Sequence, residues 1–152
     1  MKKLLASLNV QTCLLLSTFV FTLVALVSYI INISTEYFQA YAPSGAYFAF
    51  LILSLVFAAG FIVLKILKEN KIFKIAENVI LAVLPGLLMA AVMFLFLDRI
   101  YYVLVIFTYE KNETNMAALM PALVSFAAAA LASIIALASS FMKDKEIGQV
   151  KE

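Results

Sequence analysis

The sequence predicts an all-α integral membrane protein, a four-helix transmembrane bundle with both termini cytoplasmic. Three observations lead to this fold class. Hydrophobic residues make up 66% of the 152 residues and charged residues 13%, whereas soluble domains carry roughly 45–50% and about 25%. The apolar residues gather in four uncharged segments, and most basic residues fall on one side of those segments. A soluble domain of this length cannot bury so much apolar surface in one core.

The four apolar segments cover about 12–31, 45–64, 78–97 and 116–141. Each is close to the roughly 20 residues that a membrane-spanning helix needs. We expect them to form one four-pass domain over residues 1–152, with the lipid bilayer as its principal partner.

The basic residues predict the orientation of the bundle. Nine of the eleven precede the first segment, separate the second from the third, or follow the fourth: Lys2, Lys3, Lys65, Lys68, Lys71, Lys74, Lys143, Lys145 and Lys151. Arg99 and Lys111 fall on the other side. Because cytoplasmic loops carry the excess of Lys and Arg, both termini are expected in the cytoplasm and the protein in the plasma membrane.

The first segment carries polar side chains along one seam, at Gln11, Thr18, Thr22 and Tyr29. Hydroxyl groups within a membrane helix bond to backbone carbonyls or across to neighbouring helices. The seam therefore indicates either structural contacts between helices or the polar lining of a path for a solute.

Tyrosines concentrate on the predicted outer side. All seven lie in the outer half of the predicted bundle: Tyr29, Tyr37, Tyr41, Tyr47, Tyr101, Tyr102 and Tyr109. Tyrosine favours the headgroup level of a membrane, so an interfacial belt is one interpretation. The absence of tyrosine from the cytoplasmic side leaves a ligand or partner surface as the other.

The third segment contains Pro85 and Gly86, where proline removes a backbone hydrogen bond. We expect a kink there, either static or acting as a hinge. The segment also continues past Leu97 through Asp98 to Tyr109. One helix over 78–109 would be about 48 Å long against a hydrocarbon core of about 30 Å. It must therefore break at Asp98 or extend outside, where its apolar residues would pack against the tyrosine-rich loop.

The sharpest candidate for a ligand or partner contact lies at this outer mouth. It comprises six residues: Asp98, Arg99, Tyr101, Tyr102, Tyr41 and Tyr47. Adjacent helical residues diverge by about 100°, so one charge is expected to face the bundle and its neighbour water or headgroups. A charge pair at the membrane interface with no ligand is the alternative interpretation.

The fourth segment is rich in small residues at spacings of three and four: Ala118, Ala122, Ser125, Ala129, Ala132, Ala136 and Ser140. Small faces let membrane helices approach closely, either within the bundle or against another chain. We expect five residues to serve either in helix packing or in lining a path for a solute: Thr18, Thr22, Ser125, Ala129 and Ser133.

Several chemistries are missing from the chain. It has no histidine and one cysteine, Cys13, which excludes an intrachain disulfide and a Cys/His nucleophile. Asp98 and Asp144 are expected on opposite membrane faces, which excludes an aspartyl dyad. The four segments lack ionisable residues, the usual marks of ion coupling. The sequence therefore predicts a non-enzymatic protein without cofactor, metal or nucleic-acid partner.

Three roles remain compatible with these features. The first is an accessory or assembly subunit of a larger membrane complex, in contact with other membrane subunits or with itself. The second is a channel or facilitator for a small solute, acting as a homo-oligomer. The third is a binding module that displays the outer, tyrosine-rich surface.

Overall fold

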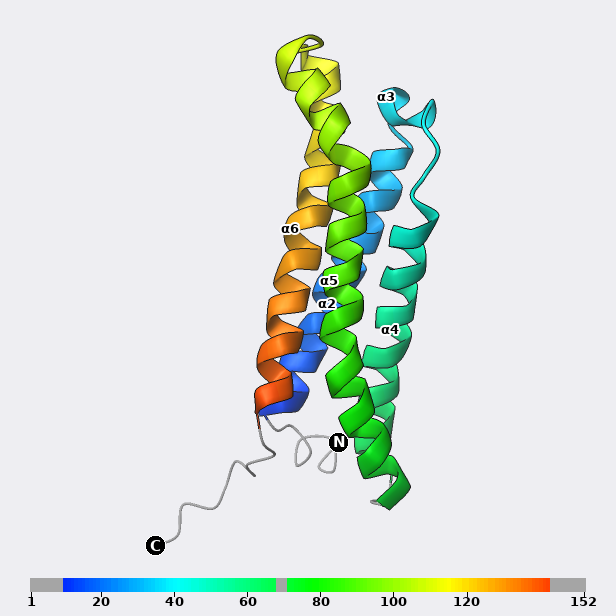
Figure 1. Ribbon diagram of the computed structural model, residues 1–152, viewed down its shortest axis with the longest axis vertical. Coiled ribbons are helices and arrows are strands. Elements are labelled where there is room, and N and C mark those ends of the chain that lie inside the picture. The colour runs from blue at the N-terminus through cyan, green and yellow to red at the C-terminus, as the bar shows by residue number, and fades with distance from the viewer. Residues whose placement is uncertain (1–9, 68–70, 143–152) are drawn as a thin grey trace, which may run out of the picture.

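The computed structural model describes residues 10–67 and 71–142 and is built from helices there (Figure 1). The elements are α2 (Val10–Ile33), α3 (Glu36–Gln39), α4 (Gly45–Ile66), α5 (Lys71–Thr108) and α6 (Glu113–Phe141). Four of them are long and apolar enough to cross a membrane, which confirms the predicted four-helix membrane bundle. Seven of the charged residues used above lie outside the described residues: Lys2, Lys3, Lys68, Lys143, Asp144, Lys145 and Lys151.

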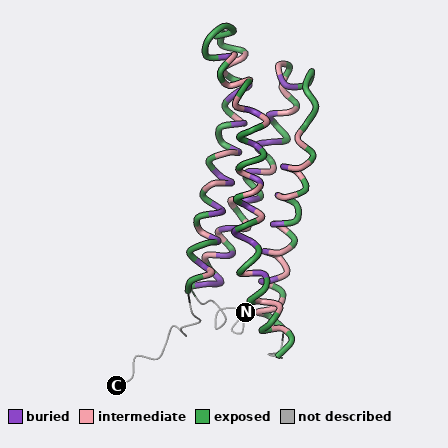
Figure 2. The backbone as a smooth tube through the Cα atoms, viewed as in Figure 1, coloured by how far each residue is buried: buried purple, intermediate pink, exposed green. Residues whose placement is uncertain are grey.

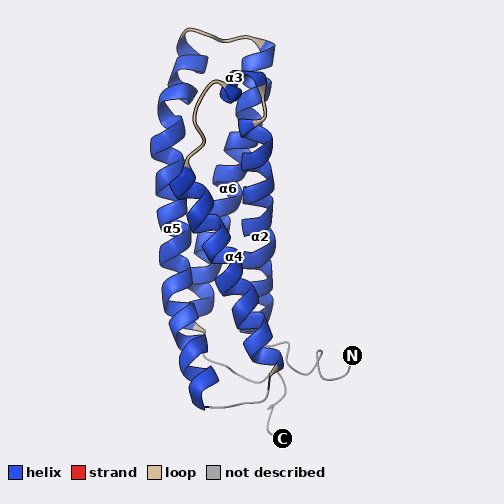
Figure 3. Ribbon diagram, turned by 90° about the vertical axis from the view of Figure 1, so that its right-hand side faces the viewer, coloured by secondary structure: helices blue, strands red, loops and turns tan. Residues whose placement is uncertain are grey.

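The four long helices form a closed ring. Helix α6 makes its most extensive contacts with α2 and packs next against α5, while α4 packs against α5 and α2. The start of α2 and the end of α6 meet at one end of the bundle, here called the termini end (Figures 1 and 3). The short helix α3 and the turn between α5 and α6 lie at the opposite end, here called the α3 end.

Most of the helix surface faces outward. Buried residues follow the inner side of each helix and exposed residues the outer side (Figure 2). The outward side chains include large apolar residues on every long helix, such as Val20, Val56, Met93 and Ile134. An apolar exterior of this kind is the surface that the bilayer covers.

The small face of α6 is used inside the chain. Its buried members are Ala118, Ala122, Ser125, Ala129, Ala132 and Ala136, and Ser133 is buried as well. Small residues let the two backbones approach closely, which accounts for the extensive contact between α6 and α2. This packing explains the composition of α6 without a second chain.

The polar seam of α2, from Gln11 to Tyr29, is buried within the bundle. Thr18 and Thr22 are buried, and their hydroxyls donate to the helix's own carbonyls, at Leu14 (3.0 Å) and Thr18 (2.7 Å). At the termini end, the Gln11 amide donates to the carbonyls of Ser139 and Met142. These bonds tie the start of α2 to the end of α6, where the Ser139 carbonyl also accepts from the backbone N–H of Met142 at 3.3 Å.

Helix α5 is continuous over 38 residues, about 57 Å. The alternative of a break at Asp98 is wrong. The extension instead packs against the loop that carries α3, as the other alternative predicts: the ring of Tyr102 lies 5.9 Å from that of Phe38 and 4.3 Å from that of Tyr41, between centroids.

Pro85 lies inside α5 and is buried. Since proline has no N–H, the carbonyl four residues earlier, that of Leu81, loses its helical donor. The Ser140 hydroxyl of α6 donates to this carbonyl at 2.5 Å. The Leu81 carbonyl, which Pro85 leaves without a helical donor, is therefore hydrogen-bonded to a neighbouring helix. A hinge at Pro85 and Gly86 stays a prediction.

Candidate functional site at the α3 end

Arg99 lies at the centre of the α3 end, with 3% of its surface exposed. Helix α5 places it on the inner side of the bundle, one residue after the half-buried Asp98. The ring of Phe38 lies 4.6 Å from the guanidinium carbon and the ring of Tyr29 lies 5.4 Å from it. Aromatic faces at these distances attract a cation.

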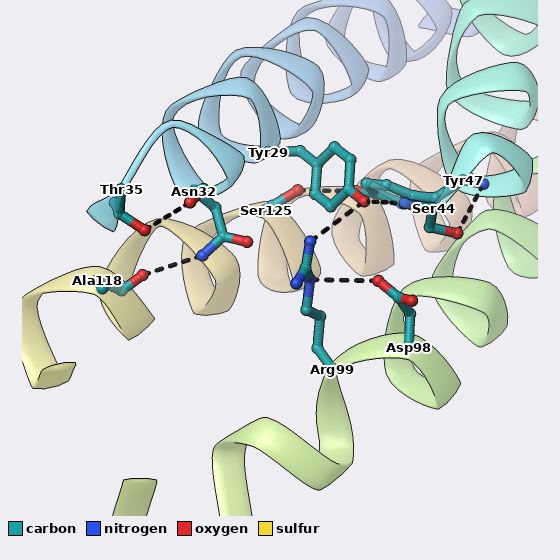
Figure 4. A network of polar contacts seen from close by, with 9 residues as sticks. All are labelled: Tyr29, Asn32, Thr35, Ser44, Tyr47, Asp98, Arg99, Ala118 and Ser125. Carbon is teal, nitrogen blue, oxygen red and sulfur yellow. Dashed lines mark hydrogen bonds and ion pairs between the residues drawn. The ribbon is translucent and has the colours of Figure 1, made fainter. Parts of the chain in front are cut away.

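The polar partners of Arg99 are few (Figure 4). Its Nε lies 3.3 Å from Oδ2 of Asp98, and its Nη2 donates a long hydrogen bond of 3.4 Å to the Tyr29 hydroxyl. Nε and Nη1 of Arg99 and Oδ2 of Asp98 have no hydrogen-bond partner. A guanidinium carries five N–H donors, so most of its capacity is unused.

A second set of bonds joins three helices beside Arg99. The Tyr29 hydroxyl also accepts from the backbone N–H of Ser44 (2.7 Å), just before α4. The Tyr47 and Ser125 hydroxyls share a hydrogen bond of 2.7 Å, and Ser125 donates to the carbonyl of Ala25 at 2.7 Å. These contacts link α2, α4 and α6 at one level of the bundle.

Asn32 supplies a further polar group. It is fully buried, and its Nδ2 donates to the carbonyl of Ala118 at 3.0 Å. Its Oδ1 has no hydrogen-bond partner and points toward the guanidinium of Arg99 (Figure 4). The site thus holds an unpaired acceptor beside unpaired donors.

The outermost layer of the α3 end is aromatic. Phe38 is buried there against Ile106 and Leu119, with Tyr102 partly buried at its edge. At the margin, burial and the neighbouring Glu110 carboxylate raise the pKa of Tyr37 well above its ordinary value. This contact attaches α3 to the turn between α5 and α6.

The structure brings the six predicted contact residues into one connected set. Tyr41 and Tyr102 join Arg99 through Phe38, and Tyr47 joins it through Tyr29, whose ring lies 4.7 Å from its own. Tyr101 lies at the edge of the set: its ring is 5.7 Å from that of Tyr102, and the residue is 67% exposed. As predicted, one charge faces the bundle while the other is partly exposed, yet the two side chains still meet.

The other predicted residues lie elsewhere. Thr18, Thr22, Ala129 and Ser133 are buried along the bundle, and Ser125 belongs to the bonds beside Arg99. Two residues that the prediction omitted are central: Phe38, which covers the guanidinium, and Asn32. Asn32 follows Tyr29 by three residues on the seam of α2, and that spacing is the signal that identifies it.

Among the described residues, no group of three or more Cys, His, Asp or Glu side chains is placed to hold a metal ion. No family model, curated protein or solved structure matches the chain.

Proposed function

We propose that the protein is an accessory or assembly subunit of a larger membrane complex. Its partner is another integral membrane protein that packs along the outer face of α5. This role belongs to the plasma membrane, with both termini in the cytoplasm and the α3 end outside. Lys65 near the end of α4 and Lys71 and Lys74 at the start of α5 support that orientation.

The observation that carries the proposal is the continuous apolar face of α5. Met93, Leu97, Tyr101 and Leu104 are all exposed and fall within about 80° of one another around the helix. The first two belong to the part of α5 that lies beside α4, whereas the last two belong to the extension. Exposed apolar surface outside the bilayer marks an interaction site.

This continuity specifies the partner's chemistry. Lipid covers Met93 and Leu97 but not an extension beyond the bilayer. A water-soluble partner would therefore cover only the part of the face formed by Tyr101 and Leu104. A partner with its own helix protruding from the membrane covers both parts. The channel hypothesis has less support, because the hydroxyls of Thr18 and Thr22 donate to carbonyls of their own helix.

Site-specific photocrosslinking at native expression level tests the proposal. A benzophenone side chain at Leu104 is expected to give an adduct with a second, different polypeptide. The same group at Ile134, on the outward face of α6, serves as the matched control and should give no protein adduct. A lone monomer in mild detergent with no adduct from Leu104 would overturn the proposal. An adduct of twice the protein's own mass would favour a homo-oligomer instead.

The orientation is tested separately by thiol labelling. Cys13 is the chain's one cysteine, so Cys13→Ser provides a background without thiols. A cysteine at Lys111 should react with an impermeant reagent added to whole cells, and one at Lys71 should react after the cells are opened. The reverse pattern would contradict the orientation.

A further inference from the structure

The acid–base pair Asp98–Arg99 lies at the level of a membrane boundary. The Tyr29 hydroxyl binds both the Arg99 guanidinium and the backbone N–H of Ser44, the residue that caps α4. Helix α4 has 22 residues, about 33 Å, which matches a hydrocarbon core of about 30 Å. Arg99 is therefore level with one end of a helix that just spans the core, where lipid headgroups begin.

At this level of the bundle, Arg99 has N–H groups that donate no hydrogen bond. It is almost completely buried, and its Nε and Nη1 make no hydrogen bond. A buried charge is costly unless it is paired and hydrogen-bonded. Its single carboxylate contact uses one oxygen of Asp98, at 3.3 Å. The protein thus presents an incompletely satisfied cation and a partly exposed anion next to each other.

We propose that this pair binds the headgroup of a zwitterionic phospholipid. A phosphate oxygen accepts hydrogen bonds from Arg99, and the ammonium group of the same headgroup pairs with Asp98. The pair as a whole is neutral, so a purely anionic headgroup would gain from Arg99 and be repelled by Asp98. A headgroup that carries both charges satisfies both side chains.

The surroundings of the pair suit the ammonium end. The mutually tilted rings of Tyr41 and Tyr102 lie 4.3 Å apart between centroids, and aromatic faces attract ammonium groups. Phe38, which covers the guanidinium, belongs to a helix of four residues. Phe38 is itself fully buried, so binding of the phosphate to Arg99 requires the Phe38 side chain to turn aside.

Native mass spectrometry of the delipidated protein tests the proposal. The full-length chain in detergent is offered equal amounts of dioleoyl phosphatidylethanolamine and phosphatidylglycerol, which differ in the headgroup ammonium. We expect about tenfold greater retention of the ethanolamine lipid. Arg99→Gln should lower that retention about tenfold, and Asp98→Asn should remove most of the preference while leaving the phosphate contact. Glu77→Gln, in the ion pair with Lys65 at the termini end, is the matched control and should change neither quantity.

Two arms decide the source of the headgroup and the role of folding. Free O-phosphoethanolamine at millimolar concentration should not displace the lipid, because the acyl chains contribute to binding; displacement would overturn the assignment to a lipid. If Arg99→Gln does not fold, Asp98→Asn decides alone, with its fold checked by circular dichroism. Equal retention of the two lipids by the wild type, or an unchanged preference in Asp98→Asn, would overturn the proposal and leave a water molecule between Asn32 and Arg99 as the occupant.

Discussion

Replacing Ser125 by alanine tests the bonds that join α2, α4 and α6. The Ser125 hydroxyl is fully buried and makes hydrogen bonds of 2.7 Å to the Tyr47 hydroxyl and to the carbonyl of Ala25. Two interhelical bonds within a membrane are worth about 1 kcal/mol together. The substitution also leaves the buried Tyr47 hydroxyl without its partner, which adds about 1–3 kcal/mol. We therefore expect Ser125→Ala to lower the free energy of unfolding by about 2–4 kcal/mol.

A double-mutant cycle separates the two contributions. Tyr47→Phe alone removes one bond and leaves Ser125 bonded to Ala25, so its cost should be about 0.6 kcal/mol. In the Tyr47→Phe background no hydroxyl is stranded and only the bond to Ala25 remains, so the cost of Ser125→Ala should fall to about 0.6 kcal/mol. The assay is unfolding by sodium dodecyl sulfate in mixed micelles, followed by circular dichroism. Ser17→Ala is the control, because Ser17 bonds to its own helix at Cys13, and its cost should stay within about 0.5 kcal/mol.

An additive cycle would contradict this expectation, because Ser125 and Tyr47 would then not share the bond that the structure shows. A cost of Ser125→Ala no greater than that of Ser17→Ala would contradict it too, because the stranded hydroxyl would then have found another partner.

Two further predictions concern other parts of the bundle. Ser140→Ala should lower the free energy of unfolding by about 1 kcal/mol, because it leaves the Leu81 carbonyl without a donor. In a Pro85→Ala background the backbone N–H of the new alanine serves that carbonyl, so Ser140→Ala should cost less. An equal cost in the two backgrounds would contradict this prediction. Burial and the Glu110 carboxylate raise the pKa of Tyr37 above its ordinary value of 10, so the folded state favours the neutral phenol. The stability that the neutral phenol provides is complete below pH 10 and is lost as the pH rises through the pKa of the folded state. Absorbance titration at 295 nm against Tyr37→Phe should show it, and Glu110→Gln should lower that pKa.

The sequence predicted the bundle because hydrophobicity and charge are local properties. A run such as 45–64 needs no knowledge of its neighbours to be identified as a span. The spacing of small residues also identified the inner face of α6, from Ala118 to Ala136. It could not say whether α2 or a second chain covers that face, because either partner requires the same small side chains.

The candidate site was predicted in part for a similar reason. Asp98 and Arg99 stand out in the sequence because charges are scarce there. Their surroundings come from residues about 60 to 70 positions earlier in the chain, Tyr29 and Phe38, and no local pattern reports such a contact. Arg99 faces inward because of the rotation of α5 about its own axis, and that rotation follows from the packing of the whole helix. The sequence predicts that one of the two adjacent charged residues faces inward, but not which one.

The bonds of α6 have a consequence for the order of assembly. Ser140 satisfies Leu81 on α5, Ser125 satisfies Ala25 on α2, and the carbonyl of Ala118 receives Asn32. Helix α6 is synthesised last of the four, so α5 would enter the bilayer with the Leu81 carbonyl unpaired if it inserted alone. Insertion of α5 and α6 together as a hairpin avoids exposing that carbonyl to lipid. A chain truncated before α6 would retain three apolar helices but lack the groups of α6 that bond to α2 and α5.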